Sequence, residues 1–353
     1  MLLEVISICV LAFGTILYTF RKSQIGMDIY YTIRYFYCGI KYWLYDVFDA
    51  KYNKISDLPS MPDKIAIVTG ASRGIGAEVV KKLLQCNMEV IIACRTINAG
   101  EKLILEIRKS GITSGCAKVY KLDNASFKSV REFAEQINKD YSKIHILINN
   151  AGVMFSLVYT TTKDGFEEQW AINYLSHFLL TFLLLPLLEA GGQPDSCSRI
   201  INVTSCANTI GDMNFNYIKN CSKNTYCRHL SYAESKLAQT VFTITLHKLL
   251  KNRSVNVQVY SVHPGIVRTD LFKNTFFAQD GKWLTTLWKT PEQGAIPIVY
   301  VAVNKDVEIK SGTYFSNCKE VAAPSLALKE DIQKELFELT LKQVKLSDFF
   351  QLL

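Results

Sequence analysis

The chain has 353 residues, of which 49% are apolar, and a formal net charge of +8 at pH 7. This composition supports one large core, or a core with a small appendage, and excludes an intrinsically disordered protein. The charge is mild and no dense Lys/Arg block is interleaved with aromatics, so we expect no nucleic-acid partner. The 10 cysteines are scattered without a CxxC pair or a histidine cluster, which predicts reduced thiols and no metal site. Four N-x-S/T sequons keep a lumenal placement open.

The first 20 residues form a mostly apolar run about as long as a bilayer-spanning helix, and Arg21 and Lys22 follow it. A cleaved signal peptide would need positive charge before the run and a small-residue cleavage site after it, and the sequence has neither. We therefore expect residues 1–22 to be a membrane anchor. Basic residues after the run predict a cytosolic catalytic part. We expect the membrane to be that of the endoplasmic reticulum or a lipid droplet. A secretory signal removed from the mature chain is the open alternative.

Residues 29–48 combine seven tyrosine or tryptophan residues with Arg34 and Lys41. Amphipathic rings beside long cations suit the membrane–water interface, so the pattern predicts a helix or re-entrant piece that lies against lipid headgroups. A core helix of the following domain is the alternative. Pro59 and Pro62 separate this segment from the first strand, and we expect residues 23–61 to be an interfacial segment with its linker.

The segment from Lys64 to Gly76, KIAIVTGASRGIG, predicts a short buried strand that runs into a turn with Gly70, Gly74 and Gly76. The residues that follow have helical spacing, with an apolar face made of Val79, Val80, Leu83 and Leu84. Glycines let a backbone approach a pyrophosphate closely, and a helix N-terminus offers free N–H groups. The pattern therefore favours a dinucleotide site over an ordinary strand-to-helix turn.

From Lys64 onward the predicted strands and helices alternate. Such alternation predicts an α/β fold with a doubly wound parallel sheet that helices cover on both faces. We assign one catalytic domain to residues 62–320 and a C-terminal helical extension to residues 321–353. The expected strands are 64–69, 89–94, 116–121, 144–149, 198–204, 255–262 and 313–316. The apolar helices 164–190 and 229–250 could form the face of a homodimer, although a monomer held at a bilayer is equally consistent.

The predicted second strand ends at Cys94 and Arg95, where an acidic residue would bind the ribose hydroxyls of NAD. An arginine at this place can accept the 2′-phosphate of NADP, and Arg73 in the glycine turn could reach the same phosphate. We therefore expect NADP to be preferred, with NAD possible. Asp123 follows the third strand and either binds the adenine amino group or caps the helix that begins near Ser126.

Two adjacent asparagines, Asn149 and Asn150, follow the buried fourth strand, where their amides need fixed hydrogen-bond partners. Further on, Ser205 follows the strand RIINVT, and Tyr232 and Lys236 share a face of a predicted helix because they are four residues apart. A lysine ammonium there lowers the pKa of the phenol, so Tyr232 can exchange a proton with a substrate oxygen near neutral pH. Ser205 could hydrogen-bond that oxygen.

In these motifs the chain resembles the short-chain dehydrogenase/reductase family over about residues 62–320. TGASRGIG is similar to the family's coenzyme turn, NNAG to its sheet-stabilising motif, and HPGIVRTD to the loop that closes on the nicotinamide. The resemblance implies a Rossmann-type fold in which Tyr232 is the general acid/base, Lys236 lowers its pKa and holds the nicotinamide ribose, and Ser205 orients the substrate. Asn173 matches the asparagine that holds a water between Lys236 and solvent. The implied coenzyme-binding residues are Gly70, Ser72, Arg73, Gly74, Ile75, Gly76, Arg95, Asp123, Asn150, Ala151, Gly152, Tyr232, Lys236, Pro264, Gly265, Val267 and Thr269.

The spacing between Ser205 and Tyr232 is longer than in compact family members, and the insert at about residues 208–228 has no obvious role. Similar extensions occur in the retinol dehydrogenase-like branch, which the tripeptide ACR at 93–95 also resembles. The N-terminal anchor and aromatic segment resemble the dehydrogenase/reductase X-linked, polyprenol dehydrogenase-like members. This closer resemblance implies a polyprenol-type lipid as substrate.

The segment between Thr269 and Pro291 is rich in Phe and Trp. In the family such a segment walls the substrate pocket, which implies a lipophilic substrate, whereas core packing or membrane docking of these rings is the alternative. The C-terminal run is expected to be helical to about Val344 and then to add an apolar flap, which could meet membrane, substrate or a second subunit.

These observations together predict a membrane-associated oxidoreductase that transfers a hydride between NADP(H) and a lipophilic alcohol, aldehyde or ketone. Polyprenol, retinoid and steroid substrates all remain open. The alternative from another class is a catalytically silent, nucleotide-binding family member that acts as a membrane scaffold or sensor. The filled catalytic positions argue against that alternative, because a silent protein has no chemical need for Tyr232 and Lys236.

Overall fold

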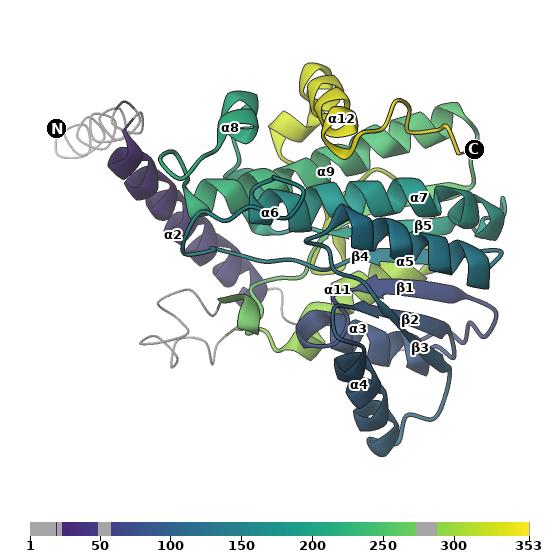
Figure 1. Cartoon of the computed structure of the whole chain (residues 1–353). Helices are drawn as coiled ribbons and strands as arrows, with labels where there is room; N and C mark the ends of the chain where they lie inside the picture. The colour runs from purple at the N-terminus through teal and green to yellow at the C-terminus, as the bar shows by residue number, and fades with distance from the viewer. Residues whose placement is uncertain (1–18, 20–22, 49–57, 273–287, 353) are drawn as a thin grey trace.

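The computed structural model describes residues 19, 23–48, 58–272 and 288–352 (Figure 1). Within these residues, eight strands form one sheet in the order β3-β2-β1-β4-β5-β6-β7-β8. The strands are β1 (Ile65–Thr69), β2 (Glu89–Cys94), β3 (Cys116–Lys121), β4 (Ile146–Asn149), β5 (Ser198–Val203), β6 (Val257–His263), β7 (Tyr314–Ser316) and β8 (Lys319–Val321). All neighbours pair in parallel except β7 and β8. The predicted parallel sheet is confirmed, whereas β8 is too short and polar for the pattern to indicate it.

Helices cover both faces of this sheet (Figure 1). One layer contains α3 (Gly74–Gln85), α4 (Ile97–Lys109) and α11 (Pro291–Val303), and the other contains α5 (Phe127–Asp140), α7 (Ser176–Gly191), α9 (Arg228–Asn252) and α12 (Glu330–Val344). Strand side chains alternate between the layers, so that in β1 Ala66 and Val68 pack with the first layer and Ile67 with the second. Shorter segments are α6 (Glu168–Trp170), η2 (Ala171–Leu175), η3 (Cys206–Thr209), α8 (Phe215–Asn220), η4 (Asp270–Phe272), η6 (Lys305–Val307) and η7 (Ser325–Leu328).

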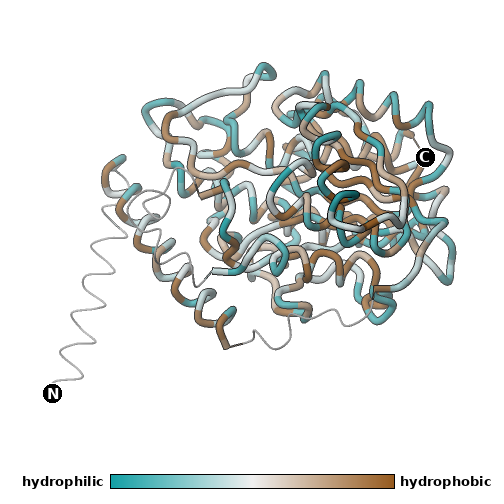
Figure 2. Tube along the Cα trace, turned by 90° about the horizontal axis from the view of Figure 1, so that it is seen from below, coloured by the Kyte–Doolittle hydropathy of each residue, from teal (hydrophilic) through white to brown (hydrophobic). Residues whose placement is uncertain are grey.

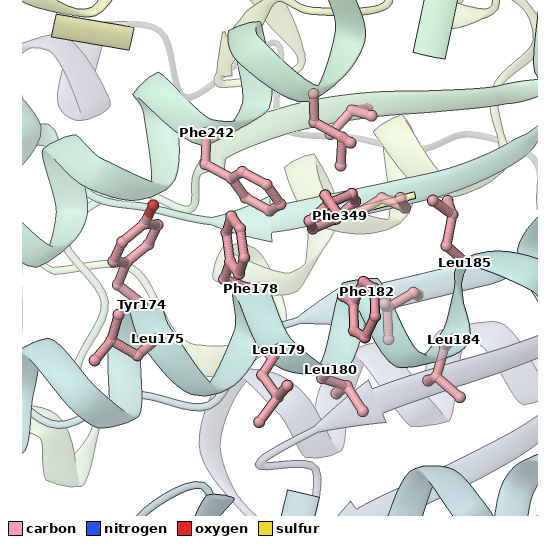
Figure 3. Packing of buried hydrophobic residues seen from close by; sticks show 14 of the residues in the cluster. Tyr174, Leu175, Phe178, Leu179, Leu180, Phe182, Leu184, Leu185, Phe242 and Phe349 are labelled. Carbon is pink, nitrogen blue, oxygen red and sulfur yellow. The ribbon is translucent and has the colours of Figure 1, made fainter. Parts of the chain in front are cut away.

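The C-terminal residues belong to the main core. As predicted, α12 ends at Val344. Beyond it, Phe349 is only 1% exposed, and its ring centre lies 5.0 Å from that of Phe178 and 5.6 Å from that of Phe182. Figure 3 shows Phe349 among these rings and Phe242. The expected apolar flap is therefore wrong for Phe349, because this ring fills the core instead of covering an opening.

The helices expected to form a dimer face are apolar because the chain itself buries them. One stretch of the described residues, Glu168–Gly191, is long and apolar enough to cross a membrane, but 89% of its apolar window is buried. On the same side, Tyr174 hydrogen-bonds Thr340 of α12 at 2.8 Å, and Trp170 donates to Gln343 at 3.0 Å. The C-terminal residues thus cover the surface on which the homodimer expectation rested.

An N-terminal helix, α2 (Gln24–Phe48), lies against the catalytic domain (Figure 1). Tyr31 and Cys38 are buried there, and Tyr35 and Tyr42 pack on the same cluster. Hydrophobic and hydrophilic residues alternate along the helix (Figure 2). The predicted helix is present, but one of its faces packs on the domain, as in the alternative interpretation. The expected anchor at residues 1–22 lies outside the described residues except for Thr19.

Candidate active site

The turn from β1 into α3 has the backbone that a pyrophosphate requires. Gly70 and Gly74 have φ angles of +63° and +58°, which are costly for residues with a Cβ atom. A Cβ on Gly76 would lie 2.6 Å from the Gly70 carbonyl oxygen. No side chain in the described part of the chain caps α3, so its first N–H groups and positive dipole end can bind an anion. This turn, which includes the predicted contacts Ser72 and Ile75, fits a dinucleotide.

The NNAG motif holds the glycine turn in place. The Thr69 hydroxyl accepts hydrogen bonds from the N–H groups of Asn150 at 2.9 Å and Ala151 at 3.0 Å. The Asn150 amide donates to the Thr69 carbonyl at 2.8 Å, and the Asn149 amide donates to Asn202 at 2.9 Å. A Cβ on Gly70 would come within 2.8 Å of the Cα atom of Ala151, so the two segments touch. The predicted fixed partners are therefore present for the NH₂ groups of both asparagines, whereas the Asn149 Oδ1 atom is buried without a hydrogen-bond partner among the described residues.

The two arginines predicted to bind a 2′-phosphate are both exposed. Arg95 directly follows β2, whereas Arg73 forms an ion pair with Asp270 at 3.3 Å. The Asp123 carboxylate accepts a hydrogen bond at 3.1 Å from the backbone N–H two residues later, and Ser126 caps α5. The capping alternative for Asp123 was therefore wrong, and its contact with adenine stays a prediction.

The loop at residues 264–269, which follows β6, reaches the glycine turn. The methyl group of Thr269 lies 3.6 Å from the place where a Cβ on Gly74 would stand. Val267 is buried and forms a parallel bridge with Lys289. Backbone hydrogen bonds in both directions between the loop and Lys289, at 2.9 and 3.0 Å, hold this arrangement. The loop is therefore fixed beside the predicted coenzyme site.

Ser205 and Tyr232 meet beyond the carboxyl end of β5. Ser205 precedes η3, and its hydroxyl accepts the N–H of Ala207 at 3.2 Å. Tyr232 lies in the second turn of α9 and is 3% exposed. Burial raises the pKa of Tyr232, and a hydrogen bond with Ser205 opposes that increase. Two hydroxyl groups this close can both bind one substrate oxygen.

Lys236 shares the face of α9 with Tyr232, as predicted, and its Nζ atom lies 5.8 Å from the centre of the Tyr232 ring. Nζ donates to the Val203 carbonyl and to the Gln239 side chain, both at 2.9 Å. Burial lowers the pKa of Lys236 to about 7. The predicted lowering of the Tyr232 pKa is not seen in this structure, where burial raises it and the ammonium hydrogen-bonds Val203 and Gln239.

Asn173 lies in the π-helical segment η2, between α6 and α7. Wider turns of this kind are frequent at functional sites. Its side chain accepts the Val153 N–H at 2.8 Å and donates to the Val153 carbonyl and the Ser235 hydroxyl, both at 3.0 Å. A Cβ on Gly152 would stand 3.3 Å from Asn173 Oδ1 and 3.7 Å from Lys236 Nζ. The structure therefore brings Asn173 and Lys236 to the same place, beside the NNAG motif.

Sequence reasoning missed an aromatic wall around Tyr232. The ring centre of Phe155 lies 5.7 Å from that of Tyr232, and the ring centre of Tyr35, from α2, lies 6.5 Å away. Phe155 and Tyr35 also contact each other, with ring centres 4.9 Å apart. The available signal was helical spacing, because Tyr31, Tyr35, Cys38 and Tyr42 pack on one cluster. Aromatic residues on every side of α2 obscured that face.

A cavity of about 720 Å³ lies at the amino ends of the strands, where Lys64, His145 and Arg199 help to line it. Ligands of open α/β sheets bind beyond the carboxyl ends of the strands. Ser205 and Tyr232 lie at that opposite edge, so the cavity is not the reaction site.

Comparison with known proteins agrees with this geometry. The family model for short chain dehydrogenase matches residues 64–280. Human polyprenol dehydrogenase is 36% identical over 79% of this chain and 84% of that relative, and human retinol dehydrogenase 11 is 38% identical over 79% and 85%. A crystal structure of an uncharacterized protein from Mycobacterium paratuberculosis superposes with a TM-score of 0.66 at 28% identity, and the match covers 82% of this chain and 97% of the other. The chain therefore belongs to the short-chain dehydrogenase family, as an NAD(P)-dependent oxidoreductase.

Proposed function

We propose that this enzyme interconverts a lipophilic alcohol with its aldehyde or ketone, prefers NADP(H), and works at a membrane surface. One observation carries the proposal: the buried Tyr232, next to Ser205, stands among apolar and aromatic side chains rather than in a polar crevice. A sugar or an amino acid would leave its polar groups without partners there, whereas a lipid tail would not.

The chemistry divides between the coenzyme and the chain. When bound, NADP(H) supplies or accepts the hydride. In the reductive direction, the Tyr232 hydroxyl donates its proton to the substrate oxygen, and in the oxidative direction it takes that proton back. Ser205 hydrogen-bonds the same oxygen and orients it. Lys236 and Asn173 are buried near Tyr232, where Lys236 donates to the Val203 carbonyl and Asn173 to the Ser235 hydroxyl. We assign Lys236 to holding the ribose and both residues to relaying the proton.

Two relatives that match most of the chain are named for lipid alcohols, polyprenol and retinol, which supports a substrate of this class. The side chains around Tyr232 support it independently, because Met154, Phe155 and Leu230 belong to the same buried cluster. We favour a polyprenoid or retinoid over a steroid on the names of these relatives.

The NADP preference rests on Arg95. It follows β2, is exposed, and no acidic residue ends that strand. A guanidinium there attracts the 2′-phosphate of NADPH, whereas the ribose hydroxyls of NADH find no acidic side chain at the end of this strand. We expect Arg73 to contribute after it leaves Asp270.

The membrane assignment rests on the sequence of residues 1–22 and on the outer side of α2. That outer side exposes Ile29, Ile33, Phe36 and Ile40. Apolar residues exposed along one side of a helix favour burial in a bilayer interface.

The test uses the full chain, purified in detergent, with NADPH and NADH supplied separately to retinal, a ketosteroid and a polyprenal. Loss of nicotinamide absorbance reports turnover. We expect turnover of a lipid aldehyde with NADPH and weaker turnover with NADH. Tight NADPH binding without turnover of any of the three lipids would contradict the proposed substrate class, and equal rates with both coenzymes would contradict the NADP preference.

A further inference from the structure

Helix α2 lies outside the part of the chain that the family model matches, residues 64–280. It nevertheless packs against α9, which carries Tyr232, and against η3, which directly follows Ser205. The described part of the helix is therefore placed at the reaction site.

Three polar anchors fix α2 in this position. Near its start, the Gln24 side chain donates to the Tyr226 carbonyl at 2.7 Å, and in the middle Arg34 pairs with Asp212 at 2.9 Å. Near its end, Asp46 pairs with Lys289 at 2.9 Å, and both side chains are less than 10% exposed. Because anchors stand at both ends and the middle, the helix has one defined rotation about its axis.

Two of these anchors use the insert at residues 208–228, which contains Asp212 and Tyr226. The insert is itself held by α9, where the buried Glu234 carboxylate accepts the N–H groups of Asp212, Met213 and Asn214. The insert therefore has a physical role that its sequence did not reveal: it is the platform on which α2 lies.

The defined rotation turns Tyr35 toward the reaction site. Its ring centre lies 4.9 Å from that of Phe155, 5.3 Å from that of His229 and 6.5 Å from that of Tyr232. On the same helix, Tyr37 is 72% exposed and has no ring contact with Tyr232 among the described residues. Of these two tyrosines, only Tyr35 can reach a substrate held at Tyr232.

The hydroxyl oxygen of Tyr35 is buried and has no hydrogen-bond partner among the described residues. A buried hydroxyl without a partner destabilises the folded protein, so such a group in a native structure needs an explanation. Burial, with a further contribution from the neighbouring Tyr232, raises the pKa of Tyr35 well above its usual value, so the group stays a proton donor at all physiological pH.

We propose that α2 forms one wall of the substrate pocket and that Tyr35 is a substrate-positioning residue, whose hydroxyl hydrogen-bonds the oxygen-bearing end of the lipid held at Tyr232 and Ser205. This inference rests on the proposed function and adds to it a specificity element from outside the family domain. An apolar pocket wall would need only a phenyl ring at this position, and the hydroxyl adds recognition of a polar end.

The test compares Tyr35→Phe with wild type and with Tyr37→Phe, the matched control on the same helix. Each full-length protein, in detergent with NADPH, is assayed for KM and kcat on the lipid aldehyde that wild type reduces. Unfolding temperature and NADPH affinity are measured beside them. Loss of one substrate hydrogen bond predicts a KM about tenfold higher for Tyr35→Phe, with kcat changed far less. Tyr37→Phe should match wild type.

The unfolding temperature separates recognition from structure. Because the Tyr35 hydroxyl has no partner in the described protein, its removal should leave the unfolding temperature unchanged or raise it. A KM within twofold of wild type, or below it, overturns the inference and leaves Tyr35 as an apolar wall. A lower unfolding temperature together with weaker NADPH binding also overturns it, because the hydroxyl would then support the fold.

If wild type reduces no lipid, the proposed function fails separately from this inference. Retinal is then the binding probe, and quenching of protein fluorescence reports its affinity. Weaker retinal binding by Tyr35→Phe than by wild type supports the inference, and equal binding overturns it.

Discussion

Asp46 offers a sharp test of whether α2 is part of the enzyme. It stands in the last turn of the helix, where a carboxylate faces the negative end of the helix dipole. Two contacts stabilise the Asp46 carboxylate there: an ion pair with Lys289 at 2.9 Å, and a hydrogen bond that it accepts from the N–H of Ile266 at 2.8 Å. Lys289 also donates to Asn317.

The substitution Asp46→Asn removes the charge and leaves Lys289 buried without its counter-charge. Breaking one partner of a buried ion pair costs about 3–5 kcal/mol. An unfolding entropy of about 2.1 cal/mol/K per residue gives roughly 1.3 °C per kcal/mol for 353 residues, so the unfolding temperature should fall by about 4–7 °C. NADPH affinity should also fall, because Asp46 holds the loop at residues 264–269 beside the coenzyme site.

Differential scanning fluorimetry of the full chain in detergent measures the effect, with Glu106→Gln as the control. Glu106 pairs with Lys102 on the surface, where both side chains are more than half exposed, so its loss should cost less than about 0.5 kcal/mol. Asp46→Asn combined with Lys289→Gln should cost clearly less than the sum of the two single changes. An unfolding temperature within 1 °C of wild type for Asp46→Asn, or strict additivity in the pair, would refute the docked position of α2.

Four further outcomes are expected. Tyr232→Phe should abolish turnover with NADPH affinity nearly unchanged, measured by coenzyme titration, because only the proton-transferring hydroxyl is lost. Arg95→Asp should shift the ratio of kcat/KM values from NADPH toward NADH, and an unchanged ratio would place the 2′-phosphate elsewhere. Phe349→Ala should lower the unfolding free energy by about 3–5 kcal/mol, whereas Leu352→Ala, at a position 47% exposed, should lower it by far less. Burial lowers the pKa of His177 from about 6.5 in the unfolded chain to about 3 in the folded protein, so the unfolded chain binds a proton first as pH falls. The free energy of unfolding should therefore decrease between pH 6.5 and pH 3. This group alone contributes a decrease of about 1.4 kcal/mol in unfolding free energy per pH unit. Thermal unfolding of His177→Gln across the same pH range should show a smaller decrease.

Local patterns predicted the parts of the fold that depend on neighbours in the sequence. The strands at 89–94 and 116–121 have the predicted bounds, because short apolar or alternating runs between turn residues are a local signal. The glycine turn was also readable, since Gly70 and Gly74 adopt positive φ angles that few other residues tolerate. The sequence motifs identified the catalytic residues and their order along the chain, but they did not predict which side chains these residues contact.

Contacts between distant residues escaped prediction. Lys236 is expected to act on the Tyr232 phenol, yet its ammonium donates to the Val203 carbonyl and the Gln239 side chain, whose positions depend on how β5 and α9 pack. Phe349 was assigned to a flap because an apolar tail has the same composition whether it covers a pocket or fills a core. Only the gap left among Phe178, Phe182 and other core rings decides between these outcomes (Figure 3).

The aromatic segment at residues 29–48 and the insert at residues 208–228 could not be interpreted one at a time, but their contact explains both. The aromatic segment at residues 29–48 looked like a membrane-surface element, and the insert after Ser205 had no visible role. In the structure, Arg34 of the first pairs with Asp212 of the second across 178 positions of sequence. Neither charge indicates its partner on its own, since an arginine among aromatic residues and an aspartate in a loop are each ordinary at a surface. The pairing helps to place Tyr35 beside Tyr232, so the proposed substrate contact of Tyr35 depends on an ion pair whose arginine lies outside the residues that the family model matches.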